Sequence, residues 1–269
     1  MYFVERLSKT LRHSWLLGRI DGLWDFIRPF YDRTLVSLYR KGLERNINGT
    51  DRILIHHKTR QAPEIYEPDV WAHLMSNVRP DDTTVDVGAY IGLYAIALSK
   101  RTGPSGRVFA FEPDHENFEL LKENVKLNDI SDKMALIEAA VGESDGYIYL
   151  KHGRHSESHI CQVPDTDSVK VRCICLDSAF AQESIDILKI DVEGYEESVL
   201  RGGLRLLSDP ERSPRLIYVE VHPYAWQKVG TTSNSLLGFL KKCGYMVSFM
   251  NGKMVRMINR YGEIVAKKS

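Results

Sequence analysis

From about Thr83 onward, short apolar runs alternate with longer stretches whose apolar positions recur every three or four residues. The short runs are TTVDVG, GRVFAFEP, MALIEAAV, DILKIDVEG and RLIYVEVHP, and each ends in polar residues or glycine, as buried strands do. The intervening stretches are GLYAIALSKR, HENFELLKENVKLN, EESVLRGGLRLL and SNSLLGFLKKCG, which have the spacing of amphipathic helices. This alternation predicts an α/β domain with an open, mostly parallel sheet and helices on both faces.

Two parts of the chain depart from this alternation. YMVSFM and KMVRMI flank Asn251-Gly252, a strong β-hairpin signal, so we expect the sheet to end in an antiparallel β-hairpin formed by these two runs. YIYL and VKVRCICL predict two further strands around a loop rich in His and Ser. Cys173 and Cys175 in the second of these runs are expected to be packing residues.

The N-terminal part of the chain has a different pattern. Residues 1 to about 45 carry apolar side chains at helical spacing with basic residues between them, and Pro29 is expected to separate two helices. We expect an N-terminal helical extension over residues 1–65 and a catalytic domain over residues 66–269. The helices either pack on that domain or make weak contact with a membrane surface or a second copy in a homo-oligomer.

Composition narrows the function classes. Lys plus Arg number 36 and Asp plus Glu number 36, so the formal net charge is zero and the chain lacks the cationic excess of a general nucleic-acid binder. Four cysteines without a CxxC pair do not form a secreted disulfide framework. The N-terminus has no signal-peptide pattern and no apolar run is long enough for a transmembrane segment. These features favour a cytoplasmic protein.

The sharpest motif is VDVGAYIG (85–92), which leads from a predicted strand into a helix. Its glycines permit a tight turn close to a ligand, at the crevice where open α/β sheets bind ligands. Tyr90 stands where a dinucleotide fingerprint needs its middle glycine, which disfavours NAD or FAD. Glu112 ends the next strand and can accept hydrogen bonds from both hydroxyls of a ribose, whereas Asp86 can receive a cationic amino group.

These motifs resemble the FkbM family of class I S-adenosylmethionine (SAM) dependent methyltransferases. The resemblance runs from about Asn46 to His222 and rests on INGTD, YEPDVW, VDVGAYIGLYA, FAFEPDHENFELLKENVKLN, AAVGESDG, LDS, DILKIDVEGYEESVLRGG and YVEVHP. It implies a Rossmann-like seven-stranded sheet that ends in an antiparallel hairpin. It also implies a methyltransferase (EC 2.1.1.-) with SAM as cofactor.

The resemblance assigns cofactor-binding residues. It implies that the methionine part of SAM is surrounded by Asp86, Gly88, Ala89, Tyr90 and Gly92. Glu112, followed by Pro113, is then expected to hold the ribose, and Ala140 to lie near adenine. Tyr66 and Glu67 are expected to close over the cofactor, unless YEP only starts a helix. Asn117 either reaches adenosine or faces water.

Two further strand ends carry the candidate catalytic residues. In KIDVEG, alternation places Lys189, Asp191 and Glu193 on one face, and in YVEVHP it places Glu220 and His222 on one face, beside the first set. Such a cluster is costly unless paired or functional, so it is either a supporting Lys–Asp pair or a catalytic centre. Methylation of an aliphatic hydroxyl needs a general base or a divalent metal. We favour His222 and Asp191 as bases, with Glu193 and Glu220 orienting them or holding the substrate.

The loop over residues 152–161 contains three His and one Cys, but their spacing matches no standard zinc pattern. We therefore assign no metal ligands and expect an exposed loop over the acceptor site. The leading hypothesis is O-methylation of a hydroxyl on a sugar, glycolipid or polyketide-like metabolite, with a small-molecule or glycan acceptor. SAM-dependent N- or carboxyl-methylation and a non-catalytic SAM-binding module are the alternatives.

Overall fold

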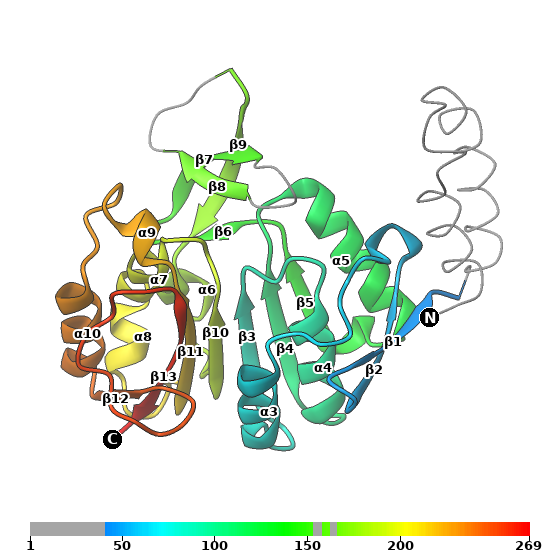
Figure 1. Ribbon diagram of the computed structural model, residues 1–269, viewed down its shortest axis with the longest axis horizontal. Helices are drawn as coiled ribbons and strands as arrows, with labels where there is room; N and C mark the ends of the chain where they lie inside the picture. Colours follow the sequence, from blue (N-terminus) through cyan, green and yellow to red (C-terminus); the bar gives the residue numbers. More distant parts are fainter. Residues whose placement is uncertain (1–40, 153–157, 162–165) are drawn as a thin grey trace, which may run out of the picture.

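The computed structural model describes residues 41–152, 158–161 and 166–269, and its largest element is a seven-stranded sheet (Figure 1). The strand order is β12-β13-β11-β10-β3-β4-β5, and the five strands from β11 to β5 are parallel. The predicted seven-stranded, mostly parallel sheet is confirmed. Its strands are β3 Thr83–Val87, β4 Arg107–Phe111, β5 Met134–Ile137, β10 Ile187–Ile190, β11 Leu216–Val221, β12 Tyr245–Ser248 and β13 Gly262–Lys268.

Hydrophobic cores lie on both faces of this sheet because side chains alternate along each strand. In β4, Val108 and Ala110 belong to one core and Phe111 to the other. The first core is covered by α3 Pro68–Asn77, α4 Leu93–Arg101 and α5 His115–Leu127. The second is covered by α6 Leu176–Ala179, α7 Glu196–Arg201, α8 Leu204–Ser208, α9 Pro223–Trp226 and α10 Ser233–Lys242. The predicted arrangement with helices on both faces is confirmed.

The antiparallel end of the sheet is present, but with a different strand from the one predicted. β12 pairs with β13, whereas KMVRMI contributes a single bridge between Met254 and Ser248. In KMVRMI only Val255 and Ile258 are buried, and this spacing differs from the alternation of a strand. β13 instead buries three successive residues, which suits a strand that lies between two others. Gly252 does form a turn, with φ of 80° and its N–H donating to the Phe249 carbonyl at 2.9 Å.

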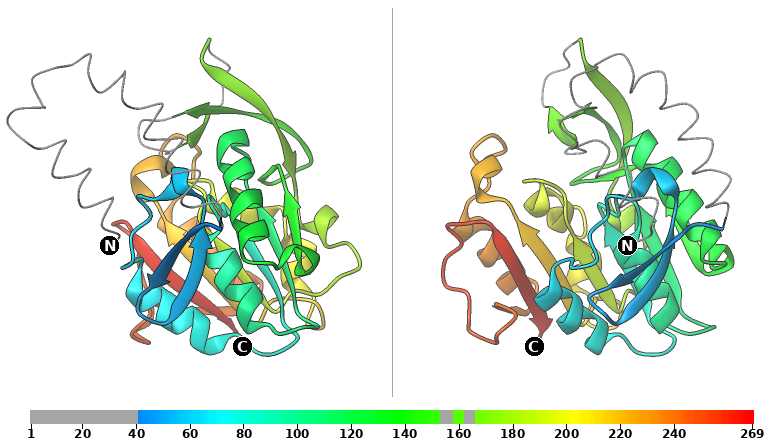
Figure 2. Two further views of the ribbon diagram at one scale, coloured as in Figure 1. Left: turned by 90° about the vertical axis from the view of Figure 1, so that its right-hand side faces the viewer. Right: turned by 45° about the vertical axis from the view of Figure 1, so that its right-hand side comes forward.

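The expected helical extension is wrong for residues 41–65. They form a β-hairpin of β1 Leu43–Ile47 and β2 Asp51–Ile55, followed by a 3-10 helix η1 His57–Thr59. Alternate hairpin residues are buried in the first core, so the hairpin lies against α4 and α5 as part of the domain (Figure 2). The helices expected nearer the N-terminus, with their membrane or dimer contacts, lie outside the described residues. Within the described part of the chain, no helix has the length and apolar character to cross a membrane.

A second, four-stranded sheet extends beyond the carboxyl ends of the parallel strands (Figure 1). Its order is β6-β9-β7-β8, from β6 Ala140–Val141, β7 Gly146–His152, β8 Ser158–Cys161 and β9 Ser168–Ile174. The two strands predicted here are therefore present as β7 and β9. The expected loop over residues 152–161 is partly strand, because β8 pairs with β7, and residues 153–157 lie outside the described residues. Cys173 is buried and Cys175 half-buried, and both are free thiols.

Candidate functional site

The turn after β3 brings the backbone of three strands into close contact. Gly88 has φ of 82°, and a Cβ at this position would lie 1.8 Å from the carbonyl oxygen of Asp191. The N–H groups of Gly88 and Ala89 both donate to the Phe111 carbonyl, at 3.0 and 2.9 Å. Gly92, with φ of 87°, then begins α4. Glycine at position 88 is therefore required by the backbone contact as well as by the positive φ.

Asp86 is a buried carboxylate in β3, two residues before Gly88. Its side chain is 1% exposed, and within the described part of the chain it has no side-chain hydrogen-bond partner, although the backbone N–H of Ala95 contributes a hydrogen bond that lowers its pKa. Burial raises the pKa of Asp86 to about 6, opposed by the charge of Lys189 on the neighbouring strand β10. A buried carboxylate with acceptor capacity left over fits a ligand that brings a cationic N–H group, as the amino group of SAM would.

Glu112 follows β4 and is 5% exposed. It accepts hydrogen bonds from the backbone N–H groups of Tyr90 at 2.8 Å and Asp114 at 3.0 Å. Burial raises the pKa of Glu112 to about 7, although these amides and the side chain of Asn117 oppose the shift. Asn117 therefore lies beside Glu112 rather than pointing only to water. The carboxylate keeps acceptor capacity for ribose hydroxyls.

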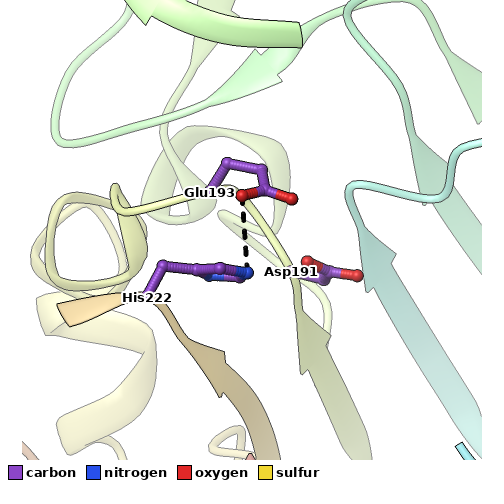
Figure 3. Close-up of side chains that lie close together, drawn as sticks. All are labelled: Asp191, Glu193 and His222. Carbon is purple, nitrogen blue, oxygen red and sulfur yellow. Dashed lines mark ion pairs between the residues drawn. The ribbon is translucent and has the colours of Figure 1, made fainter. Parts of the chain in front are cut away.

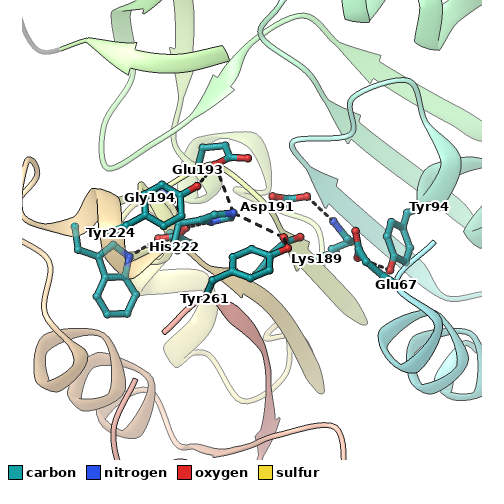
Figure 4. Close-up of polar contacts among 12 residues, drawn as sticks. Glu67, Tyr94, Lys189, Asp191, Glu193, Gly194, His222, Tyr224 and Tyr261 are labelled. Carbon is teal, nitrogen blue, oxygen red and sulfur yellow. Dashed lines mark hydrogen bonds and ion pairs between the residues drawn. The ribbon is translucent and has the colours of Figure 1, made fainter. Parts of the chain in front are cut away.

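Ala140 and the YEP segment are further predicted cofactor residues. Ala140 is buried at the start of β6. YEP does start a helix, since α3 begins at Pro68, but Glu67 also has φ of 40° and accepts a hydrogen bond from the Tyr94 hydroxyl at 2.8 Å (Figure 4). The Tyr66 ring packs against Tyr94 with ring centres 5.8 Å apart. Both side chains are therefore held against α4, close to Lys189, which lies over the Tyr94 ring at 4.5 Å.

The ends of β10 and β11 bring the candidate catalytic residues together. Lys189 is 4% exposed, and its Nζ lies 3.4 Å from Asp191 Oδ2. Glu193 adopts φ of 50°, which directs its carboxylate over His222, and the two side chains form an ion pair at 3.5 Å (Figure 3). Ligand atoms of Asp191, Glu193 and His222 lie within 4.8 Å of one another, so these three side chains could hold a metal ion.

His222 is held between carboxylates. Its side chain is 2% exposed, with Nδ1 at 2.7 Å from Glu196 Oε1 and Nε2 at 3.7 Å from Glu220 Oε1. Burial lowers the pKa of His222, but the hydrogen bond to Glu196 and the charges of Glu193, Glu196 and Asp191 raise it overall to about 9. The imidazole therefore holds its proton at neutral pH in this environment. A protonated imidazole is a weaker base, so of the two predicted candidates this environment favours Asp191, and the assignment of the general base stays a prediction.

Two partners of this cluster were missed by the sequence analysis. Glu196 is fully buried and accepts hydrogen bonds from Trp226 Nε1 and the Gly194 N–H, both at 2.8 Å, besides contacting His222. Its only sequence signal is a pair of glutamates in the first turn of α7, which is also usual at a helix N-terminus. The Tyr261 hydroxyl donates a short hydrogen bond to Glu220, and nothing in its loop sequence indicated this contact.

A groove of about 520 Å³ opens beside Tyr261. Its lining combines charged and apolar side chains, including Asp69, Glu263, Arg260, Phe249 and Met257. Burial raises the pKa of Glu220 to about 8, and the nearby charge of Asp191 adds to this shift. The Tyr224 hydroxyl donates to Glu193 Oε2 at 2.7 Å from another side of the cluster. Tyr261, which lines the groove and donates to Glu220, therefore links the groove to the polar cluster.

Comparisons with known proteins agree with this geometry. Residues 86–247 match the family described as Methyltransferase FkbM domain. The hexuronic acid methyltransferase AglP of Haloferax volcanii is 28% identical over 163 residues, covering 58% of this chain and 62% of the relative. Methyltransferase sdnD of Sordaria araneosa is 25% identical over 163 residues, covering 48% of this chain and 62% of the relative. The chain thus spans about three-fifths of the length of these relatives.

Solved structures of two methyltransferases also align with this chain. A methyltransferase FkbM from Methylobacillus flagellatus aligns with a TM-score of 0.48 and 15% identity, covering 98% of this chain and 57% of that one. A SAM-dependent O-methyltransferase from Thermotoga maritima aligns with a TM-score of 0.43 and 17% identity, covering 78% of this chain and 69% of that one. At these identities the likeness concerns the fold alone.

Proposed function

This chain belongs to the FkbM family of SAM-dependent methyltransferases, and we propose that it methylates a hydroxyl oxygen of a sugar, a glycolipid or a polyketide-like metabolite. The observation that carries the proposal is the polar cluster of Asp191, Glu193, Glu220 and His222 beside the cofactor crevice. A hydroxyl needs help to lose its proton at neutral pH, and this cluster offers carboxylates for that step. The relative AglP is named as a hexuronic acid methyltransferase, which is consistent with a sugar acceptor.

We assign the cofactor to the crevice around Gly88. SAM supplies an electrophilic methyl group on a sulfonium. Asp86 would pair with the amino group of the methionine part, because its buried oxygens have no side-chain donor within the described residues and keep acceptor capacity. Glu112 would accept the ribose hydroxyls, and the absence of a side chain at Gly88 would let the turn pack directly against the Asp191 backbone beside the ligand. Tyr66 and Glu67 would cover the crevice from the hairpin side.

We assign the acceptor to the region between the cluster and the groove at Tyr261. The acceptor oxygen forms the new bond to the methyl carbon as the carbon–sulfur bond breaks, and the hydroxyl proton passes to Asp191. The Lys189 ammonium at 3.4 Å holds Asp191 in place. Glu220 and Tyr261 would position the sugar hydroxyls next to the reacting one. The mixed lining of the groove suits an acceptor with polar and apolar parts.

Calorimetric titration with SAM and S-adenosylhomocysteine tests the cofactor site. We expect binding by the intact chain and at least about tenfold weaker binding by Glu112→Ala, since a charged hydrogen bond contributes about 1.5–3 kcal/mol. Glu138→Ala is the matched control, because Glu138 is an exposed carboxylate at the end of the next strand. Absence of binding by the folded, intact chain would contradict the proposal.

The acceptor atom is tested with isotopically labelled SAM and a panel of hydroxylated and carboxylated sugars. A label that survives mild alkaline hydrolysis is an ether and supports O-methylation of a hydroxyl. A label released by alkali is a methyl ester and would show carboxyl methylation instead. Asp191→Asn is expected to lower the transfer rate about 10²-fold to 10⁴-fold, with SAM affinity kept, if Asp191 accepts the proton.

A further inference from the structure

Asp191, Glu193 and His222 present three ligands of two types that divalent metals use, two carboxylate oxygens and one imidazole nitrogen. They come from the ends of two adjacent parallel strands, β10 and β11. The ligand atoms lie within 4.8 Å of one another. Two ligands of one cation, each about 2.1 Å from it, lie at most about 4.2 Å apart. Side-chain adjustment of less than about 1 Å would therefore complete the geometry.

We propose that Asp191, Glu193 and His222 form a binding site for a divalent transition-metal cation such as Mn²⁺. The donor set decides the class of cation. Carboxylate oxygens suit Mg²⁺, Ca²⁺ and Mn²⁺, whereas an imidazole nitrogen favours transition metals. A cation that accepts both ligand types fits this set better than Mg²⁺ does.

The orientation of His222 is the second observation that supports the site. Its Nδ1 is 2.7 Å from Glu196 Oε1, and Glu196 is fully buried and held by Trp226 and the Gly194 N–H. Metal-binding histidines typically donate one ring N–H to such a carboxylate, which fixes the ring and leaves the other nitrogen for the metal. Here the other nitrogen, Nε2, faces Glu193 at 3.5 Å.

The local charge also fits a cation. The carboxylates of Asp191, Glu193 and Glu220 surround the Nε2 side of His222, with Glu220 at 3.7 Å. Lys189 pairs with Asp191 on its far side at 3.4 Å and lies over the Tyr94 ring. Asp191, Glu193, Glu196 and Glu220 offer four carboxyl groups against the Lys189 ammonium, so a dication that displaces the Nε2 proton of His222 would be attracted to the cluster.

A cation at this site would also assist the methyl transfer proposed above. This catalytic role, unlike cation binding itself, rests on that proposed function. An acceptor hydroxyl bound to the cation would become more acidic, because a metal ion stabilises the alkoxide. The proton would still pass to a carboxylate of the cluster, with Glu220 or an unligated oxygen of Asp191 as the acceptor. Cation binding itself needs neither SAM nor the acceptor.

The test is a titration of the full chain with Mn²⁺ in the absence of SAM. The electron paramagnetic resonance signal of free Mn²⁺ measures how much of the cation is bound. We expect one bound Mn²⁺ per chain and at least about tenfold weaker binding by Glu193→Gln and Asp191→Asn. Glu196→Gln should weaken binding about 10- to 100-fold without removing a ligand. The control is His115→Gln with Glu138→Gln, an exposed His–Glu pair at 2.8 Å, and its Mn²⁺ binding should equal that of the unmodified chain.

Two outcomes would overturn the metal site: the absence of Mn²⁺ binding, and an unchanged Mn²⁺ affinity in folded Glu193→Gln. The Glu193 side chain is half-exposed, so this replacement should have little effect on folding. Mn²⁺ binding without SAM binding would support the metal site while contradicting the proposed function. SAM binding and chelator-resistant methyl transfer, without Mn²⁺ binding, would support the function and exclude the metal site.

Discussion

Glu196 Oε1 lies 2.7 Å from His222 Nδ1, and both side chains are almost completely buried. The carboxylate comes from the first turn of α7, and the imidazole follows β11, so the contact joins the turn after β10 to the neighbouring strand end. It leaves the second ring nitrogen, Nε2, facing Glu193 and Glu220. The contact therefore fixes the orientation of the His222 ring and which of its nitrogens is turned toward these carboxyl groups.

The first prediction concerns Glu196→Gln. A glutamine keeps the size of the side chain but loses the charge that orients His222 and its hydrogen bonds. We expect kcat to fall about 10- to 100-fold, with an altered pH profile of kcat and an unchanged Kd for SAM. Steady-state kinetics and calorimetry check this. A fall in SAM affinity of similar size would instead indicate a general structural defect.

The second prediction concerns Gly88→Ala. The new Cβ would lie 1.8 Å from the Asp191 carbonyl oxygen, so the turn must move and SAM binding should be lost. Gly103→Ala is the matched control, because Gly103 has a similar φ of 76° but, among the described residues, no neighbouring group within 4 Å of where its Cβ would lie. The control should lose only about 1–2 kcal/mol of unfolding free energy from its backbone conformation. Denaturant unfolding and SAM titration of both variants distinguish the two effects.

The third prediction is a pH dependence set by Glu112, whose pKa is raised to about 7. Ribose hydroxyls donate to the carboxylate form, so SAM affinity should rise about tenfold between about pH 6 and 8 as that form becomes populated. Without ligand the sign is opposite. The folded state binds the Glu112 proton more tightly than the unfolded state, so this group's contribution to stability falls as pH rises from about 4.5 to 7.

Glu112→Gln is the control for both pH effects. It cannot ionise, so the parts of the SAM affinity profile and of the stability profile that come from Glu112 should disappear. Calorimetry at several pH values and urea unfolding measure the two quantities. A profile for Glu112→Gln parallel to that of the unmodified chain would contradict the assignment.

The fourth prediction concerns acid stability and Asp51 in the hairpin. Burial raises the pKa of Asp51, but hydrogen bonds from Trp71 and Thr50 and the Arg101 guanidinium lower it overall. The stabilisation is therefore present above the unfolded-state pKa of about 4 and is lost as pH falls through the lower folded-state value. Asp51→Asn should cost about 1.5–3 kcal/mol at pH 7 and less near pH 2.

Glu44→Gln provides the comparison for Asp51. Glu44 pairs with Arg52 on the exposed side of the same hairpin, where a salt bridge contributes about 0–1 kcal/mol. Urea unfolding at pH 7 and at acid pH measures both variants. Equal losses in the two variants would contradict the special role of the buried carboxylate.

The sequence predicted those strands whose burial on both faces makes their residues apolar. The runs around Val85, Val108 and Ile190 are apolar because both faces of the parallel strands are covered, and such runs are easily recognised. The hairpin at Leu43–Ile55 was missed, because it follows a helical pattern and its short strands alternate over only five residues each. The partner of β12 was misassigned because a good turn sequence at Asn251-Gly252 does not determine which strand extends the sheet.

The site was partly predictable for a similar reason. Strand alternation placed Asp191 and His222 at neighbouring strand ends, and the structure brings them together. The protonation of His222 was not predictable, since it depends on Glu196, whose burial results from the turn at Gly194 and the packing of Trp226. Tyr261 reaches Glu220 from a loop without periodic pattern, so only three-dimensional structure reveals that contact.

The position of β13 has a consequence for how the protein is made. β13 lies between β11 and β12 although it follows both in the chain, and in the described sheet β12 pairs only with β13. As the polypeptide emerges from the ribosome, β12 cannot join the sheet until residues 262–268 have been synthesised. Until then β11 presents an open edge to other nascent chains, so completion of the sheet is a late step and a point of exposure to aggregation.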